Sequence, residues 1–316
     1  MTQATHVVDY LIVGAGSAGC VLANRLSSHP GTRVLLIEAG GTDRSPMIAM
    51  PAALPFVYQN KRLGWGYLSG PEPHLDGRLI DEKRGKVIGG SSSINAMIYN
   101  RGNPLDFEGW AALGLPDWGF AQCLPYFRKM ETFEGGANAF RGDSGPLFIS
   151  RCRAAHKLHD AFLRSGEQAG FAFTLDHNGF QQEGLHIAQA FIDHGVRASS
   201  ARAYLHPLRN RSNLQVLTRA QVTRVLIEDV IGDSVAFGVE LATAKGKRTV
   251  LAEREVILCA GAINTPQLLM LSGVGDPDAL RQHAIRVLSV ISNLSASVAN
   301  ELSGFTDRRG GGHETD

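Results

Sequence analysis

The sequence has no long apolar run and no excess of charge of one sign. No stretch approaches the roughly 18 uninterrupted apolar residues of a membrane-spanning helix, and the first residues lack the basic segment and cleavage site of a secretory signal. With 31 basic and 30 acidic residues the net charge is +1, which argues against binding to nucleic acid or an anionic membrane by charge alone. We therefore expect a soluble protein of the cytoplasm, or one peripheral to the inner face of a membrane, with no transmembrane segment and no nucleic-acid partner.

Cysteine is scarce, and the histidines are not grouped as metal ligands. The four cysteines form no CxxC pair, so we expect reduced thiols, with Cys123 and Cys152 as buried small side chains rather than nucleophiles. His156 and His159 are spaced to share one face of a predicted helix, but no third ligand lies near them in the sequence. We interpret this pair as part of a solvated helix face and expect no metal site.

Glycine is in excess, and the first glycines follow a strand pattern. Glycine makes up 36 of the 316 residues, about 11% against an average of about 7%. Residues 7–13 (VVDYLIV) form a short β-branched run typical of a strand buried on both faces of a parallel sheet. Residues 17–28 have a helical pattern and residues 33–37 predict a second buried strand. Together these segments predict one βαβ unit.

A glycine-rich loop, GAGSAG at residues 14–19, joins the first strand to the helix. In this G-x-G-x-x-G pattern the first glycine permits a tight turn, the second lets a pyrophosphate approach the backbone, and the third allows helix and strand to pack closely. Free N–H groups at the helix N-terminus favour the anion. Glu38, at the end of the second strand, is placed to hydrogen-bond ribose hydroxyls and to repel a 2′-phosphate. The unit predicts a dinucleotide site without separating NAD from FAD.

A second glycine-rich segment, RGKVIGGSSSIN at residues 84–95, can present several backbone N–H groups to a phosphate or a flavin ring. Its apolar flanks argue against a flexible linker. Between residues 39 and 85 the pattern indicates a long excursion over the surface of the sheet. Trp65 and Tyr67, in this excursion, are expected to pack the loop down rather than to line a substrate pocket.

The remaining pattern alternates helices with a group of strands. Helices are predicted at 104–113, 121–131 and 156–169, with a short one capped by Ser199 and Ser200 and another beginning at Asn264 to Pro266. Strand-like runs at 214–218, 222–227, 235–242, 249–251 and 255–259 predict a β-meander inserted into an α/β domain.

These segments resemble the glucose–methanol–choline (GMC) oxidoreductases, a family of FAD-dependent alcohol dehydrogenases and oxidases. GKVIGGSSSINAMIYNRGNPLDFE, at residues 85–108, resembles the first family signature, and GAINTPQLLMLSGVG, at residues 261–275, resembles the second. The segments DYLIVGAGSAGCVLANRLS and GVRASSARAYLHP also match. The resemblance covers residues 8 to 285 and implies an α/β fold with a Rossmann-like FAD-binding domain, an inserted β-meander and part of a substrate lobe.

The resemblance also implies a domain division and a set of cofactor contacts. The FAD-binding domain would comprise residues 1–145 and 205–285, a partial substrate lobe residues 146–204, and an irregular tail residues 286–316. The glycine loop and Glu38 would bind the ADP half of FAD, residues 95–98 would lie against the flavin and diphosphate, and Val222 would offer its backbone to the adenine. The implied cofactor-binding residues are Gly14, Ala15, Gly16, Ser17, Ala18, Gly19, Glu38, Ala39, Val87, Gly89, Gly90, Asn95, Ala96, Met97, Ile98, Val222, Ala260 and Gly261.

The implied reaction is oxidation of an alcohol CH–OH group, with hydride transfer to flavin N5 and electrons passed to a quinone, another carrier or oxygen. Choline, aliphatic and aromatic alcohols all fit this part of the family. Ile94 stands where some members carry a histidine bonded to the flavin, so FAD is expected to be held non-covalently.

The family's catalytic histidine lies near a distant C-terminus, and the resemblance fades after Arg286. We hypothesise a truncated product of a frame shift near residue 287, which a reading of the other two frames would test. None of the histidines at 177, 186, 194, 206 and 283 falls in the family's catalytic motif, so the catalytic residues stay unassigned. Two alternatives remain: a catalytically inactive FAD-binding fragment, and an NAD-dependent Rossmann dehydrogenase, which the second and third motifs oppose.

Overall fold

The computed structural model describes residues 6–152, 156–230 and 233–291, and the chain separates into two compact units. The first unit comprises residues 1–43, 58–94 and 204–316, and the second comprises residues 44–57 and 95–203. The chain passes from one unit to the other within helix α3 (Leu54–Gln59) and within the π-helical turn η5 (Ala201–Leu205). The predicted division into cofactor and substrate domains concerns function and stays a prediction.

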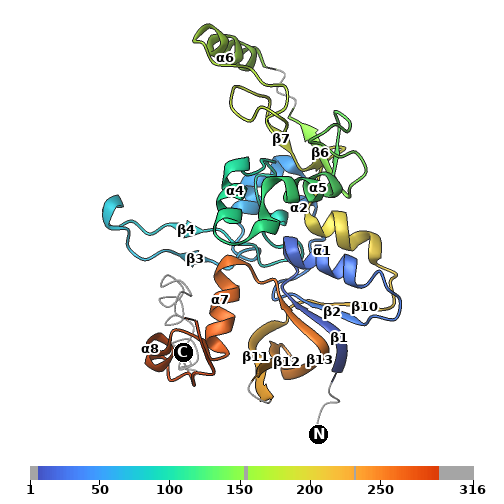
Figure 1. The fold of residues 1–316 in the computed structure, drawn as a ribbon, viewed down its shortest axis with the longest axis vertical. Coiled ribbons are helices and arrows are strands. Elements are labelled where there is room, and N and C mark those ends of the chain that lie inside the picture. The colour runs from blue at the N-terminus through green and yellow to red at the C-terminus, as the bar shows by residue number, and fades with distance from the viewer. Residues whose placement is uncertain (1–5, 153–155, 231–232, 292–316) are drawn as a thin grey trace, which may run out of the picture. The chain divides into compact units, whose positions relative to one another are not determined.

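A six-stranded sheet organises the first unit, with strand order β10-β2-β1-β13-β12-β11 (Figure 1). The parallel strands are β1 (His6–Val13), β2 (Val34–Ile37), β10 (Leu214–Leu217) and β13 (Gly246–Leu258). The antiparallel strands are β11 (Gln221–Val230) and β12 (Asp233–Thr243). Helix α1 (Ser17–Leu26) connects β1 to β2, so the predicted α/β class and its βαβ unit are confirmed.

Two strand predictions are wrong. The run at 214–218 is not part of the meander, because β10 pairs in parallel with β2 at the edge of the main sheet. The runs at 249–251 and 255–259 belong to one strand, β13, whose register with β1 shifts between Ala252 and Glu255. Glu253 interrupts the apolar pattern, but its carboxylate is exposed and lies 2.7 Å from Arg33 Nη2. The exposed charge of Glu253 interrupts the apolar pattern, and this is why the sequence predicted two strands where the structure has one.

The core of the first unit lies within and against this sheet. Alternating apolar side chains of the strands meet α7 (Gly261–Leu271) through Leu268. The cluster consists of Val8, Leu11, Val13, Leu35, Ile37, Ala220, Val225, Val239, Leu241, Val250 and Leu268. Burial of such side chains stabilises the fold by about 25 cal/mol per Å² of apolar surface removed from water.

Shorter elements complete the first unit. They are β3 (Tyr67–Leu68), η2 (Pro73–Leu75), β4 (Asp81–Glu82), η3 (Gly90–Ser93), η6 (His206–Leu208), β14 (Val274–Gly275), α8 (Pro277–Gln282) and β15 (Ser289–Val290). Helix α7 begins at Gly261, earlier than predicted, because Gly261 adopts φ +92° and turns the chain directly out of β13. The tail predicted to be irregular begins with β15, which pairs in parallel with β14; residues 292–316 lie outside the described residues.

The second unit wholly contains four of the eight α-helices of the described residues. Its elements are α2 (Pro46–Ala49), η1 (Pro51–Ala53), α4 (Pro104–Ala112), η4 (Pro116–Trp118), α5 (Phe120–Met130), β5 (Glu131–Phe133), β6 (Leu147–Arg151), α6 (Lys157–Gln168), β7 (Gln189–Ala190), β8 (Ile192–Asp193) and β9 (Val196–Arg197). The three helices predicted between residues 104 and 169 are confirmed. Residues 44–57 belong to this unit, where Arg197 Nε donates to the Ile48 carbonyl at 2.9 Å. The segment between residues 39 and 85, predicted as one excursion, is thus divided between the two units.

A buried charge network holds the second unit. Glu131 is fully buried and contacts two arginines, Arg101 at 2.9 Å and Arg141 at 2.8 Å. Arg141 also lies 2.6 Å from Asp176. Because unpaired charges are costly in the interior, these groups depend on one another.

No helix among the residues that the structure describes is long and apolar enough to cross a membrane.

Candidate functional site

The first glycine loop is closed by backbone contacts that exclude side chains. Gly14 adopts φ +100°, and a Cβ atom there would lie 2.5 Å from the Cys259 carbonyl oxygen. A Cβ at Gly19 would lie 1.9 Å from the Gly14 carbonyl oxygen. Gly16 is the N-cap of α1, with no capping side chain. The first N–H groups of the helix are thereby presented to the space in front of the sheet.

Glu38 follows β2 and is fixed by the backbone of two loops. Its Oε2 accepts a hydrogen bond from Ala15 N at 2.9 Å, and its Oε1 accepts one from Gly40 N at 2.8 Å. Burial raises the pKa of the carboxyl, while the two backbone N–H groups and the charge of Lys86 oppose that shift. Each carboxylate oxygen has a further lone pair, so Glu38 can still accept hydrogen bonds from the hydroxyl groups of a ligand.

The second glycine segment packs directly on the first. A Cβ at Gly90 would lie 2.8 Å from Gly16 Cα, and a Cβ at Gly85 would lie 2.4 Å from the Gly90 carbonyl. Gly89 N donates to the Ala15 carbonyl at 2.7 Å. Two segments that are far apart in the sequence therefore meet at the N-terminus of α1.

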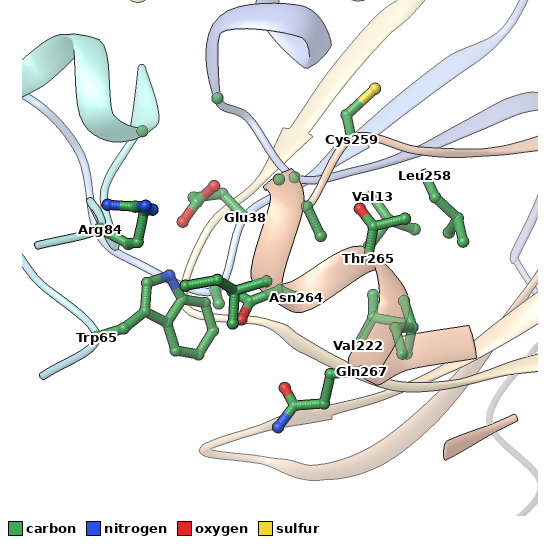
Figure 2. A pocket seen from close by; sticks show the side chains of 18 of the residues that line it. Val13, Glu38, Trp65, Arg84, Val222, Leu258, Cys259, Asn264, Thr265 and Gln267 are labelled. Carbon is green, nitrogen blue, oxygen red and sulfur yellow. The ribbon is translucent and has the colours of Figure 1, made fainter. Parts of the chain in front are cut away.

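These loops enclose a cavity of about 480 Å³ in the first unit (Figure 2). This volume lies within the range of small-molecule sites, about 300–1,000 Å³. The predicted cofactor-binding residues that line the cavity are Gly14, Gly16, Ser17, Ala18, Glu38, Ala39, Gly90, Val222, Ala260 and Gly261. The predicted residues outside its wall are Ala15, Gly19, Val87 and Gly89, which belong to the loops that shape it.

Residues 95–98, also predicted to contact the cofactor, belong to the second unit. Asn95 Oδ1 accepts hydrogen bonds from Met97 N at 3.1 Å and from Arg197 Nη1 at 3.0 Å. Ile98 forms an isolated β-bridge with Ala190, and Ala96 lies between these fixed positions. Their contact with a cofactor stays a prediction.

The cavity wall also contains residues that were not among the predicted cofactor contacts, and the aromatic and charged ones are Trp65, Tyr67 and Arg84. The Trp65 and Tyr67 rings are stacked, with centroids 5.8 Å apart, and Lys86 Nζ lies 4.4 Å from the centroid of the Trp65 ring. The Tyr67 hydroxyl donates to Asn264 Oδ1 of α7. We expected these aromatics only to pack the loop down, but both also line the cavity. The available signal was the pair of aromatics on either side of Gly66, although only Tyr67 belongs to a strand, β3.

The histidines contribute nothing to this wall in the part of the chain that the structure describes. His156 caps α6, where its Nδ1 accepts a hydrogen bond from Leu158 N at 3.2 Å. His159 Nδ1 lies 3.9 Å from Asp160. Within the described ranges, no group of three or more His, Cys, Asp or Glu side chains could hold a metal ion.

The sequence profile of the GMC oxidoreductases matches residues 8–297. The expected end of the resemblance near Arg286 was therefore too early. The mitochondrial choline dehydrogenase of Mus musculus is 45% identical over 306 residues, which cover 95% of this chain and 51% of that enzyme. The oxygen-dependent choline dehydrogenase of Staphylococcus xylosus is 47% identical over 282 residues, covering 88% of this chain and 50% of that enzyme.

Solved structures share the fold over a similar range. Pyridoxine 4-oxidase from Mesorbium loti superposes with a TM-score of 0.85 at 36% identity, covering 90% of this chain and 55% of that one. An FAD-dependent oxidoreductase from Chaetomium thermophilum superposes with a TM-score of 0.82 at 31% identity, covering 90% of this chain and 50% of that one. The chain thus spans about half the length of the relatives it matches.

Proposed function

This chain belongs to the GMC oxidoreductase family, and on that premise we propose that it binds FAD in the cavity of the first unit. The observation that carries the proposal is the convergence of three features: a glycine loop closed by backbone contacts, the free N-terminus of α1, and a buried carboxylate at the end of β2. This is the arrangement that holds the pyrophosphate and ribose of a dinucleotide.

The residues present fit the ADP half of FAD. A side chain at Gly90 would collide with Gly16, so the second loop leaves backbone rather than side chains beside the helix N-terminus. Glu38 would accept hydrogen bonds from the ribose hydroxyls, and the N–H groups that follow Gly16 would donate hydrogen bonds to phosphate oxygens. The buried Ile94, 4% exposed, carries no nucleophilic atom, which supports non-covalent binding.

For the whole protein we propose oxidation of an alcohol CH–OH group, with choline as the first substrate to test because two relatives are named choline dehydrogenases. FAD, when bound, supplies the hydride acceptor for such a reaction. The residues of this chain would bind and orient the cofactor and shield it from water. A quinone, another carrier or oxygen would take the electrons, and we propose a cytoplasmic protein or one peripheral to the inner face of a membrane.

A second candidate function is FAD binding without alcohol oxidation by this chain alone. It is favoured by the absence of any histidine from the cavity wall among the described residues. Removal of a general base typically lowers a rate by about 10²–10⁴-fold.

The test is titration of the purified chain with FAD, followed by gel filtration and a visible spectrum. Trp65 lines the cavity, whereas Trp110 and Trp118 belong to the second unit. We expect retained flavin and quenching of tryptophan fluorescence that is lost in Trp65→Phe and kept in Trp110→Phe.

Release of the flavin on denaturation would support non-covalent binding. Bleaching of the flavin by choline or another alcohol would support oxidation, whereas bound flavin without bleaching would support the second candidate. Absence of retained flavin would refute the proposed cofactor.

A further inference from the structure

The wall of the cavity has a simple charge pattern. Among the described residues that line it, Glu38 is the only acidic side chain and Arg84 the only basic one. We propose that Arg84 binds the diphosphate of the dinucleotide through its guanidinium group. This inference rests on the proposed function, because it presupposes a phosphate-bearing ligand in this cavity.

A chain of glycine contacts places Arg84 near the N-terminus of α1. Arg84 precedes Gly85, which packs on Gly90, which in turn packs on Gly16, the N-cap of the helix. The backbone of Arg84 is also fixed, since its carbonyl accepts a hydrogen bond from Trp65 N at 3.0 Å. The arginine is therefore positioned by backbone contacts beside the place where the glycine loop would hold a pyrophosphate.

The charges of the wall favour a cation at this position. A diphosphate is doubly charged, and Glu38 adds an anionic group to the same cavity. The N-terminus of α1 contributes only about half an elementary charge. Without Arg84 the side chains of the wall would carry a net negative charge opposite an anionic ligand.

The neighbouring lysines, Lys83 and Lys86, do not line the cavity. Lys83 pairs with Asp81, and Lys86 lies over the Trp65 ring at 4.4 Å from its centroid. The side chain of Arg84 is 46% exposed. Its Nη1 donates to the Lys83 carbonyl at 2.8 Å, and its Nη2 lies 3.4 Å from Glu82. A guanidinium has five N–H donors arranged to match phosphate oxygens, so both contacts are compatible with an anionic ligand.

The experiment measures the Kd for FAD of the wild-type chain and of the Arg84→Gln, Arg84→Lys and Arg78→Gln variants. Each titration is made at about 0.01 M and about 1 M salt, where the screening length falls from about 30 Å to about 3 Å. Arg78 is exposed in the same segment of the first unit and does not line the cavity, so it is the matched control.

We expect Arg84→Gln to weaken FAD binding about 10- to 100-fold at low salt, as for loss of a charge-assisted hydrogen bond. The variant should also lose much of the salt dependence of the wild type. Arg84→Lys should retain part of the affinity, because it keeps the charge without the planar fork. Arg78→Gln should bind like the wild type.

Two outcomes would overturn the inference. One is unchanged affinity in Arg84→Gln; the other is weaker binding with the wild-type salt dependence, which would mean that Arg84 acts only through the loop structure. If the wild-type chain itself binds no FAD at either salt concentration, the proposed function fails, and that result is distinct from either outcome. Far-UV circular dichroism of every variant separates lost binding from lost folding.

Discussion

Replacement of Glu131 by glutamine tests whether the buried charge network stabilises the second unit. Glu131 is 0% exposed and accepts four hydrogen bonds: from Arg101 Nη2 at 2.9 Å, from Arg141 Nε at 2.8 Å and Nη2 at 3.1 Å, and from Gly142 N at 2.9 Å. Glutamine keeps the shape of the side chain but removes its charge and replaces one acceptor oxygen with a donor. Glu131→Gln thus leaves two buried guanidinium groups facing an amide.

The expected loss follows from what remains around each arginine. Arg141 keeps Asp176 at 2.6 Å, whereas Arg101 keeps only neutral partners among the described residues, two backbone carbonyls and the Tyr99 hydroxyl. Removal of one partner from a buried ion pair costs about 3–5 kcal/mol. Since domains are stable by only about 5–15 kcal/mol, this one substitution should remove about a fifth or more of the stability of the second unit.

Urea unfolding of the Trp65→Phe chain provides the assay, because the remaining tryptophans, Trp110 and Trp118, both lie in the second unit. With m of about 1–3 kcal/mol/M, the fluorescence midpoint of Glu131→Gln should fall by at least about 1 M. Glu167 is an exposed carboxylate of α6 in the same unit, and Glu167→Gln should change stability by no more than about 0.5 kcal/mol. A loss below about 1 kcal/mol in Glu131→Gln would refute the reasoning and indicate that apolar contacts alone stabilise the unit.

Three further predictions concern single residues. Burial, followed by the positive potential of His186, lowers the pKa of His177 below its ordinary value of 6.5. As the pH falls, the unfolded chain therefore binds a proton at His177 before the folded chain does. The stability present above about pH 6.5 should then decrease by up to about 1.4 kcal/mol per pH unit. Denaturant unfolding at pH 7 and at pH 5 measures this loss. Gly19→Ala should destabilise the first unit by about 1–3 kcal/mol and weaken FAD binding, because the new Cβ would lie 1.9 Å from the Gly14 carbonyl oxygen. Cys20, 0% exposed and with its thiol pKa raised by burial, should resist alkylation at pH 8 while the chain is folded, as mass spectrometry of the labelled protein would show.

Each of these has a matched control. His177→Gln should have a shallower pH dependence than the wild type, and an equal slope would exclude His177 as the source. Gly31→Ala introduces a Cβ with no atom within 4 Å and should be nearly neutral; equal losses in the two variants would argue against a steric cause. Cys123 is partly exposed, and labelling of Cys20 at the rate of Cys123 would contradict the burial argument.

The sequence by itself determined the βαβ unit and the chemistry of its loop. Those features depend on residues close together in the chain: a β-branched run, a helical pattern, glycines where φ is positive or a Cβ cannot fit, and an acid at the end of the second strand. Local patterns of this kind are visible without any tertiary contact. The second glycine segment was visible in the same way, as glycines and serines between apolar residues, and its glycines pack on the first loop.

Only the tertiary structure decided which distant segments share the cavity wall. Arg84 lines it because Gly16, Gly85 and Gly90 permit two backbone segments that are remote in the sequence to approach within contact distance. The sequence also did not show that β10 pairs with β2, because a short apolar run is equally typical of a parallel edge strand and of a strand in a meander. The pairing of buried charges in the second unit likewise joins residues up to 35 positions apart, as in the contact between Arg141 and Asp176. In each case the stabilising contacts form between segments that are remote in the sequence, and a local sequence pattern does not indicate which segments will meet.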